Sequence, residues 1–276
     1  MSRRAQLKIN YLLQAGRTVT RHVHTGPLRI LQSLYPEGDA VCHNVVVHPP
    51  SGLVGGDILD LAIAVATGAH GLVTTPGAAR FYRSDGDLAL QQTQIDLSES
   101  ARFEWLPLES IAFSGCRAEN QLNITLAPGA ELMGWDITAL GLPAANQPFD
   151  KGFFSQHIEV EGVWLERACI KALDVLLLDS PVGLAGHRCM ATLFFASGSV
   201  LSRCRMQGAL DAARAVVQLH PLSSSAGATS PHRQVIVVRV LSSVVEPAMD
   251  LLQQIRVAWR DYFWALAGTA PRVWAT

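Results

Sequence analysis

A glycine-rich segment from His48 to Asp57, His-Pro-Pro-Ser-Gly-Leu-Val-Gly-Gly-Asp, carries the residues whose types and spacing most directly suggest chemistry. Phosphate-binding loops follow the pattern GxxxxGK[ST], but here an aspartate follows Gly55 and Gly56, and a carboxylate repels phosphate. Nucleotide binding is therefore not expected. A carboxylate beside glycine backbone acts as a turn cap or as a contact for a hard cation, and Asp57 is a candidate for either role.

Acidic residues also recur on the predicted strands. They could supply the carboxylate pair of a glycosidase-type site, and the candidates are Asp57, Asp60, Glu104, Glu109, Glu131 and Glu166. Carboxylates on the solvent face of a sheet are ordinary, however, and the chain contains neither GxSxG nor HExxH. His22 and His24 could share one strand face and bind nickel or zinc, although a lone H-x-H pair is more often incidental.

A second distinctive segment, Thr74 to Ser84, runs from small uncharged residues into Arg80-Phe81-Tyr82-Arg83. An aromatic pair flanked by arginines is typical of a contact with a partner protein. The alternative is structural, with Phe81 buried and the arginines exposed.

The elements that position these residues are predominantly β-strands between residue 20 and about residue 170. Polar and apolar residues alternate without a break over 121–126, as in a half-buried strand, and the same pattern occurs over 59–65 and 93–97. We therefore expect a mainly β fold, in a single large domain over residues 1–276 with a β-rich part to about residue 200.

A weak internal repeat links these strands. The turns Val65-Ala-Thr-Gly68-Ala69, Leu97-Ser-Glu-Ser100-Ala101 and Leu126-Ala-Pro-Gly129-Ala130 each separate two strands and begin 32 and 29 residues apart. This spacing favours stacked antiparallel hairpins with glycine or serine at the bend. A solenoid is the alternative.

Helix signals appear only in the C-terminal third. An alanine-rich stretch predicts a short helix over about 209–217, and a firmer helix is expected over about 247–267. Apolar residues recur there at three- and four-residue steps, with proline in the first turn and Gly268 after the end. The serine-rich stretch 223–230 is typical of a flexible loop, followed by a strand over 235–241.

The composition indicates a large core and few surface charges. Apolar residues make up 49% of the 276 residues, and charged residues make up 16%, against roughly 25% in an average soluble protein. Either both faces of a sheet are buried or another protein covers part of the surface. Only three basic residues are lysines; arginine is enriched at interfaces, although genome base composition produces the same bias.

Several function classes are excluded. The net charge of −1 argues against nucleic acid as a partner. No apolar run follows Arg3 and Arg4, so no signal peptide is expected. The uncharged stretch 61–79 contains His70 and Pro76 and does not resemble a membrane helix. Five scattered cysteines without a CxxC pair fit reduced thiols. We therefore expect a soluble, cytoplasmic protein.

These segments make the chain recognisable. It closely resembles the urease accessory protein family UreD, called UreH in some organisms, and the resemblance covers essentially the whole chain, weakening between about 200 and 233. Ser51 stands where many relatives carry a second glycine. The matching pieces, in family order, are Gly26-Pro27-Leu28, His48–Asp57, Thr74–Arg83, Glu104-Trp105-Leu106-Pro107 with Glu109, Gly134-Trp135 with Gly141, and Pro271-Arg272-Val273-Trp274.

The resemblance implies a β-rich domain with a few helices and a role in urease maturation. A member of this family would bind the accessory protein UreF, and through it the GTPase UreG, while contacting the urease apoenzyme subunits. That complex delivers nickel to urease, and a dimer of the assembled complex fits the family. GTP hydrolysis would belong to UreG, so we expect no enzymatic activity and no tightly bound cofactor in this chain.

Two mechanisms follow from this resemblance. In the first the chain is a conduit, because Ni²⁺ in transit needs weak, replaceable oxygen ligands; the candidates are Asp57, Asp60, Glu131 and Glu166, with Thr74 and Thr75 beside them. In the second the chain is a pure scaffold that nickel never touches. The candidate partner contacts are Arg80, Phe81, Tyr82, Arg83, Trp259 and Phe263. A β-sheet hydrolase or lyase remains a third hypothesis.

Overall fold

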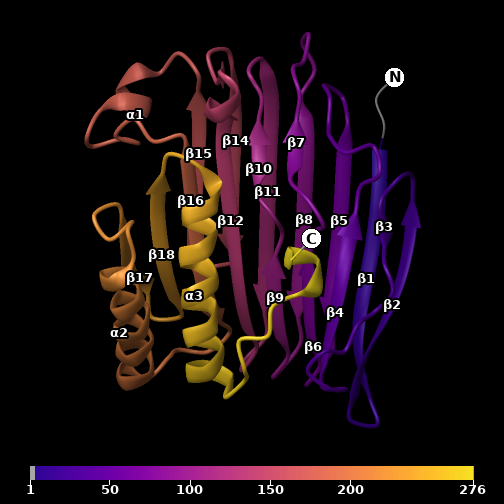
Figure 1. The fold of residues 1–276 in the computed structure, drawn as a ribbon. Helices are drawn as coiled ribbons and strands as arrows, with labels where there is room; N and C mark the ends of the chain where they lie inside the picture. Colours follow the sequence, from indigo (N-terminus) through magenta and orange to yellow (C-terminus); the bar gives the residue numbers. More distant parts are fainter. Residues whose placement is uncertain (1–3, 276) are drawn as a thin grey trace.

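The computed structural model describes residues 4–275, so the N-terminal Arg3 used above lies outside the described residues. Two large β-sheets pack face to face, and two long helices cover the outer face of one of them (Figure 1). The prediction of a mainly β chain with helices near its C-terminus is confirmed.

The first sheet has seven strands within the described residues and contains most of the alternating segments. Its strands, in spatial order, are β15 (Trp164–Lys171), β14 (Gly152–Val160), β11 (Cys116–Leu126), β8 (Ala89–Leu97), β5 (Ile58–Val65), β1 (Arg4–Gln14) and β2 (Arg17–Thr25). Alternation along these strands turns apolar side chains toward the second sheet and polar ones outward.

The second sheet has eleven strands within residues 4–275. Its main path is β17 (Ala226–His232), β18 (Val235–Ser242), β16 (Cys189–Ser197), β12 (Glu131–Leu142), β9 (Arg102–Leu106), β6 (His70–Thr74), β4 (Val41–Val47) and β3 (Arg29–Ile30). Three short strands attach to this path: β7 (Ala79–Phe81), β10 (Ser110–Ala112) and β13 (Gln147–Pro148).

The repeat found in the sequence is real, but the hairpin interpretation of it is wrong. β5 and β6 lie in different sheets, and each strand pairs in parallel with the equivalent strand of the next repeat, β5 with β8 and β6 with β9. The chain therefore winds as a β-solenoid, which was the alternative. Antiparallel pairs occur elsewhere, for example between β1 and β2 and between β12 and β16.

The three repeat turns explain this winding. Gly68, Ser100 and Gly129 all have positive φ, of 70°, 56° and 73°, a backbone conformation that glycine adopts without strain. The turns also stack, because Ser98 donates its backbone N–H to Val65 and Ala127 donates to Leu97, each at 2.9 Å. Each turn thus passes the chain from one sheet to the other.

The helices of the C-terminal third lie on the second sheet. α2 (Arg203–Leu219) is longer than predicted, and α3 (Val245–Trp264) begins two residues before the predicted start and ends three before the predicted end. A short helix α1 (Val175–Asp179) and two 3-10 turns, η1 (Pro143–Ala145) and η2 (Arg272–Ala275), had no sequence prediction. The loop prediction over 223–230 is wrong beyond residue 225, because β17 begins at Ala226.

The two faces of the second sheet are chemically different. Its inner face joins the first sheet in one apolar core, whereas its outer face, called here the helix side, packs against α2 and α3 in a second core. After α3 the chain turns back across the helix side and ends over the middle of the sheet (Figure 1). Among the described helices, none is both long and apolar enough to span a bilayer.

Candidate site: a polar row between the sheets

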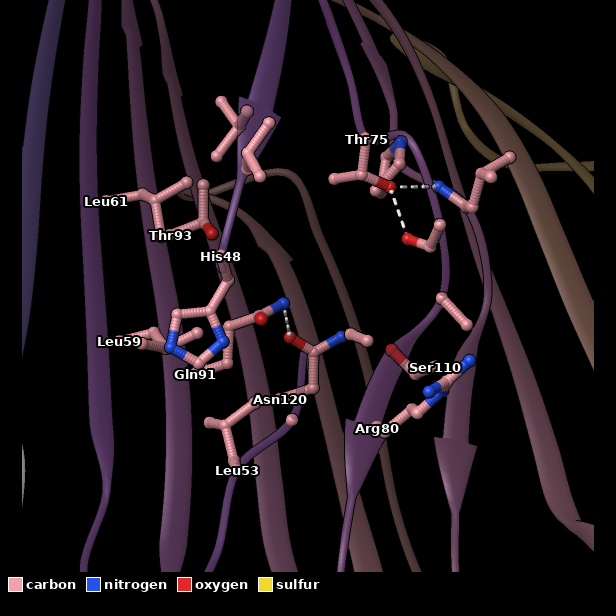
Figure 2. Close-up of a pocket in the computed structure, with 18 of the residues that line it drawn as sticks. His48, Leu53, Leu59, Leu61, Thr75, Arg80, Gln91, Thr93, Ser110 and Asn120 are labelled. Carbon is pink, nitrogen blue, oxygen red and sulfur yellow. Dashed lines mark hydrogen bonds between the residues drawn. The ribbon is translucent and has the colours of Figure 1, made fainter. Parts of the chain in front are cut away.

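A cavity of about 340 Å³ lies between the two sheets (Figure 2). Its walls come from both sheets, from the glycine-rich segment around His48 and from the segment that carries Thr75 and Arg80. Leu59 and Leu61 make one wall apolar, while Gln91 and Asn120 supply polar groups (Figure 2). The two segments singled out in the sequence therefore border one space.

A chain of hydrogen bonds leads from this cavity into the core. Gln91 on β8 donates to the Asn120 side-chain oxygen at 3.2 Å, and Asn120 on β11 donates to Asp136 Oδ2 at 2.8 Å. Asp136 Oδ1 accepts from Thr138 Oγ1 at 3.1 Å and also from the Gln156 amide on β14. The strand alternation places all five side chains on the inner faces of the sheets.

Asp136 has an unusual electrostatic environment. Burial raises the pKa of its carboxyl group to about 6, because a charged carboxylate is poorly solvated in the core. The nearby Glu166 carboxylate also raises the pKa, while the donors Thr138, Gln156 and Asn120 lower it. A carboxyl group with a pKa of about 6 is mostly ionised at neutral pH.

The polar side chains continue past Asp136 toward the edge of the sheets. Thr192 on β16 lies directly opposite Asp136 in the antiparallel register, a spacing of roughly 5 Å between Cβ atoms. Thr192 Oγ1 donates to Glu166 Oε1 at 2.9 Å, and Glu166 on β15 also binds Arg239 on β18. We call the set Gln91, Asn120, Asp136, Thr138, Gln156, Thr192 and Glu166 the polar row.

The polar row offers oxygen ligands but no tight metal site. Its groups are two carboxylates, neutral amides and hydroxyls, which suit hard or borderline cations. Within residues 4–275, no three His, Cys, Asp or Glu side chains gather as a metal-holding group.

His48 lines the cavity, and Asp57 lies beside it. The buried Asp57 carboxylate accepts from the Val54 backbone N–H at 3.1 Å, as a turn cap does. Both residues line a hollow of about 180 Å³, which shares His48, Gly52 and Leu59 with the larger cavity. Partial burial lowers the pKa of the His48 imidazole, an effect that Asp57 opposes. A neutral imidazole can bind a metal.

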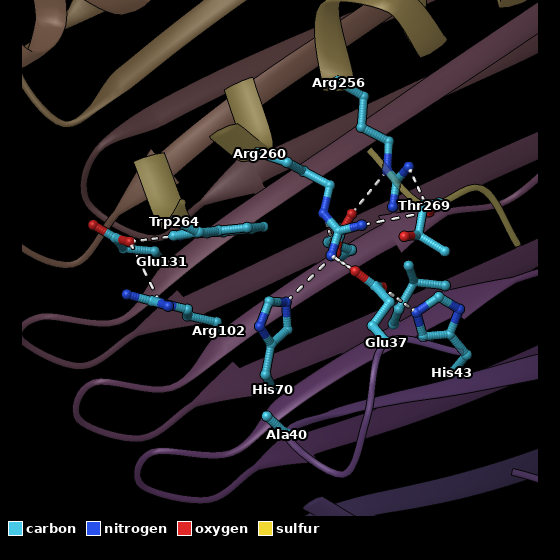
Figure 3. A network of polar contacts seen from close by, with 12 residues as sticks. Glu37, Ala40, His43, His70, Arg102, Glu131, Arg256, Arg260, Trp264 and Thr269 are labelled. Carbon is cyan, nitrogen blue, oxygen red and sulfur yellow. Dashed lines mark hydrogen bonds and ion pairs between the residues drawn. The ribbon is translucent and has the colours of Figure 1, made fainter. Parts of the chain in front are cut away.

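Asp60 and Glu131 lie outside the polar row. Asp60 is on the outer face of the first sheet, with Arg4 at 2.9 Å and Gln6 at 3.0 Å. Partial burial alone would raise its pKa, but these partners lower it. Glu131 is on the helix side, where Arg205 binds it at 2.5 Å. It also accepts from the Trp264 indole N–H at 2.7 Å (Figure 3).

The two predicted threonines are separated by the second sheet. Thr74 is buried on the helix side, where it donates to the Leu106 carbonyl at 2.6 Å and accepts from Trp274 at 2.8 Å. Thr75 lies in the cavity wall and accepts from the Leu108 backbone N–H at 2.9 Å (Figure 2). Only Thr75 of this pair borders the cavity.

The four predicted partner contacts in the second segment differ in how exposed their side chains are. Arg80 and Arg83 are exposed, whereas Phe81 is fully buried against Phe154, at 5.3 Å between ring centroids. Tyr82 is half-buried and packs on Phe113. Phe81 therefore anchors the segment, as in the structural alternative, while the exposed Arg83 pairs with Asp85 at 3.2 Å and the exposed Arg80 borders the cavity.

Trp259 and Phe263 of α3 point into the chain itself. Trp259 is fully buried and donates its indole N–H to the Ala209 carbonyl of α2 at 2.9 Å. Phe263 stacks on Phe195 of β16 with ring centroids 3.6 Å apart. In the isolated chain the apolar stripe of α3 packs on its own sheet, and a partner contact by these two rings stays a prediction.

A second polar cluster holds α3 on the sheet (Figure 3). The buried Arg256 and Arg260 bind the carboxylates of Glu104 and Glu37, at 2.8 Å and 2.6 Å. Burial would raise the pKa of Glu104, but Arg256, His70 and Arg260 lower it to about 2. Glu104 is thus a structural anion, and neither Glu104 nor Asp60 suits the general-acid role of a glycosidase.

Sequence reasoning found one end of the polar row and missed its centre. Glu166 was among the predicted metal contacts, whereas Asp136, Asn120 and Gln156 were not. The signal was present, because Asp136 lies in a strand otherwise rich in large apolar residues. A carboxylate in such a strand is buried and must find polar partners.

The fold and this site define a β-solenoid protein with a buried polar row between its two sheets. The chain matches the model of the UreD urease accessory protein family over residues 3–275. It is similar to proteins named urease accessory protein UreD from Polaromonas sp. strain JS666, with 65% identity, and Variovorax paradoxus, with 61% identity. The protein of that name from Leptothrix cholodnii is 49% identical. Each comparison covers 100% of both chains.

The chain therefore belongs to the UreD urease accessory protein family, and its role is in urease maturation. Such a role implies interaction with urease and with other accessory proteins.

Proposed function

We propose that this chain assists nickel insertion into urease by passing Ni²⁺ along the polar row. In the same complex it would hold UreF, and through UreF the GTPase UreG, against the urease apoenzyme. GTP hydrolysis by UreG would drive the transfer, and this chain would catalyse no reaction. The observation that carries the proposal is a buried carboxylate, Asp136, which accepts hydrogen bonds from the Asn120 and Gln156 amides inside an otherwise apolar core.

The energetic cost of this arrangement supports a functional role. Burying a carboxylate disfavours its charged form, and a neutral apolar side chain would pack in the same strand without that penalty. A side chain with a strongly shifted pKa beside a cavity is a candidate functional group. Because amides and hydroxyls bind Ni²⁺ weakly, they would release the ion to the next ligand.

The direction of the path follows from the cavity. His48, Gln91 and Asn120 line it, Asp57 lies in the adjoining hollow, and Glu166 lies at the other end of the row. Asp57 and Glu166 from the original candidates therefore fit the proposed path. Asp60 and Glu131 lie on other faces of the sheets, and the proposal does not use them.

The test is the nickel content of urease made together with the chain and the other accessory proteins. We expect Asp136→Asn, which keeps the size of the side chain and removes its charge, to lower nickel per urease active site by about tenfold. Elemental analysis of purified urease gives this content, and a pull-down shows whether the accessory complex still assembles. Asp96→Asn, at an exposed position on β8, is the matched control.

Unchanged nickel content in the Asp136→Asn sample, with assembly intact, would remove Asp136 from the path. The scaffold hypothesis would then be favoured, since it needs only the exposed surface. The observation that supports a scaffold is the pair of exposed arginines, Arg80 and Arg83, held in place by the buried Phe81. Under that hypothesis Arg80→Glu lowers nickel content by preventing assembly.

A further inference from the structure

An arginine closes the outer end of the polar row. Glu166 Oε2 accepts from Arg239 Nε at 2.9 Å and from Arg239 Nη2, so the guanidinium binds one carboxylate oxygen through two N–H groups. The other oxygen, Oε1, is held by Thr192. Both carboxylate oxygens of the last acidic ligand are therefore occupied, one of them by a positive charge.

The position of Arg239 is unusual for its strand. The residues of β18 that face the first sheet alternate with those that face the helices, and Val235 and Val237 belong to the inter-sheet core. Arg239 follows them on that inner face, directly across from Thr192, which in turn lies across from Asp136. A valine at this position would extend the apolar core. The chain instead has a charged side chain there, at the end of the polar row.

We propose that Arg239 is a gate, whose guanidinium occupies Glu166 and keeps a divalent cation from this ligand until the arginine is drawn away. This inference rests on the proposed function, because it assigns a control point to the same path. Ni²⁺ and the guanidinium compete for one carboxylate, and the two positive charges also repel each other.

The geometry allows the gate to move. The Arg239 side chain is 50% exposed, whereas that of Glu166 is 16% exposed and fixed by Thr192. Arginine has a long flexible stem, so its head group can swing toward solvent while the carboxylate stays in place. An acidic side chain of a docked protein, placed at this edge of the sheets, would supply the competing anion.

The experiment is calorimetric titration of the untagged, purified full-length chain with NiCl₂. We expect Arg239→Gln to bind Ni²⁺ about tenfold more tightly than the wild-type chain, since a neutral amide no longer competes for Glu166. The double variant Glu166→Gln/Arg239→Gln should lose this gain. Arg239→Lys, which keeps the charge, should bind like the wild-type chain, as should Arg233→Gln at an exposed turn position.

Circular dichroism shows that each variant is folded before titration. Equal affinity of the wild-type and Arg239→Gln chains would overturn the gate, and so would a gain that persists in the double variant. This failure is distinct from failure of the path. If Asp136→Asn lowers the nickel content of urease while Arg239→Gln leaves Ni²⁺ affinity unchanged, the path stands without a gate.

Discussion

At the scale of single residues, the chemistry of this chain centres on how a carboxylate can be kept in an apolar core. Asp136 is surrounded by three donors, from Asn120, Thr138 and Gln156, and each lowers the cost of its charge. These donors do not restore the ordinary pKa, because burial is the larger effect. Asp136 therefore opposes folding when ionised, and this effect can be measured.

The first prediction concerns the pH dependence of stability with Asp136→Asn. A raised folded-state pKa means that the carboxyl group contributes most below its unfolded pKa of 3.8, and that this contribution is lost as pH rises through about 6. Between about pH 4.5 and about pH 7.5, the wild-type chain should lose about 2 kcal/mol relative to the variant. Urea unfolding at both pH values gives the difference.

Asp96→Asn at its exposed position on β8 is the control for this measurement and should follow the wild-type chain at both pH values. A constant difference between Asp136→Asn and the wild-type chain across this range would contradict the raised pKa. It would mean that the three donors, or water, compensate fully for burial.

Some of these residues could be predicted from the sequence, whereas others could not, and the reason is physical. The His48–Asp57 and Thr74–Arg83 segments stand out by composition, and both border the cavity. Gln91, Asn120 and Gln156 look like any polar residue of an alternating strand, since the pattern does not show which face is buried. Only the stacking of the sheets places them inside.

At the scale of secondary-structure elements, some features of α3 could be predicted from the sequence and others could not. Its apolar residues recur at helical spacing and proline lies in its first turn, so its existence and type were predictable. Its buried arginines, Arg256 and Arg260, were not, because their partners Glu104 and Glu37 are far away in the sequence. Long-range ion pairs leave no local pattern.

The second prediction concerns this attachment of α3. Glu104→Gln should lower the free energy of unfolding by about 3–5 kcal/mol, because it leaves the buried Arg256 without its carboxylate partner, while Arg260 keeps Glu37. Since the pKa of Glu104 is lowered to about 2, its contribution is complete above the unfolded value of 4.5 and lost as pH falls toward 2. Urea unfolding near neutral pH therefore measures it in full.

Glu99→Gln, at an exposed turn position, is the control and should change stability by less than about 0.5 kcal/mol. The double variant Glu104→Gln/Arg256→Gln should recover part of the loss, since the charge left unpaired is then removed as well. A loss of under about 1 kcal/mol for Glu104→Gln would show that the cluster is not responsible for holding α3.

At the scale of the whole molecule, the solenoid winding was the least predictable feature. A strand, a tight turn and a second strand look alike in a hairpin and in a solenoid, because local sequence specifies the turn and not the partner strand. The turns at Gly68, Ser100 and Gly129 were found correctly, yet their strands pair between repeats and not within them. The loop prediction over 223–230 failed similarly, because pairing with β18 orders a small-residue strand.

The third prediction compares the stability effects of changing a buried and an exposed residue among the predicted partner contacts. Trp259→Ala should lower the free energy of unfolding by about 3–5 kcal/mol, because it empties a fully buried site between α3 and α2. Arg80→Glu changes an exposed side chain and should alter stability by less than about 0.5 kcal/mol. Urea unfolding of both variants tests this contrast.

The same two variants then test assembly. In a pull-down with the urease subunits and the accessory proteins, Arg80→Glu should reduce capture of at least one partner while the chain stays folded, because it reverses an exposed charge in a rigidly anchored segment. Arg117→Glu, an exposed charge reversal on β11, is the control and should retain capture. Full capture by the Arg80→Glu chain would contradict a partner contact by this arginine.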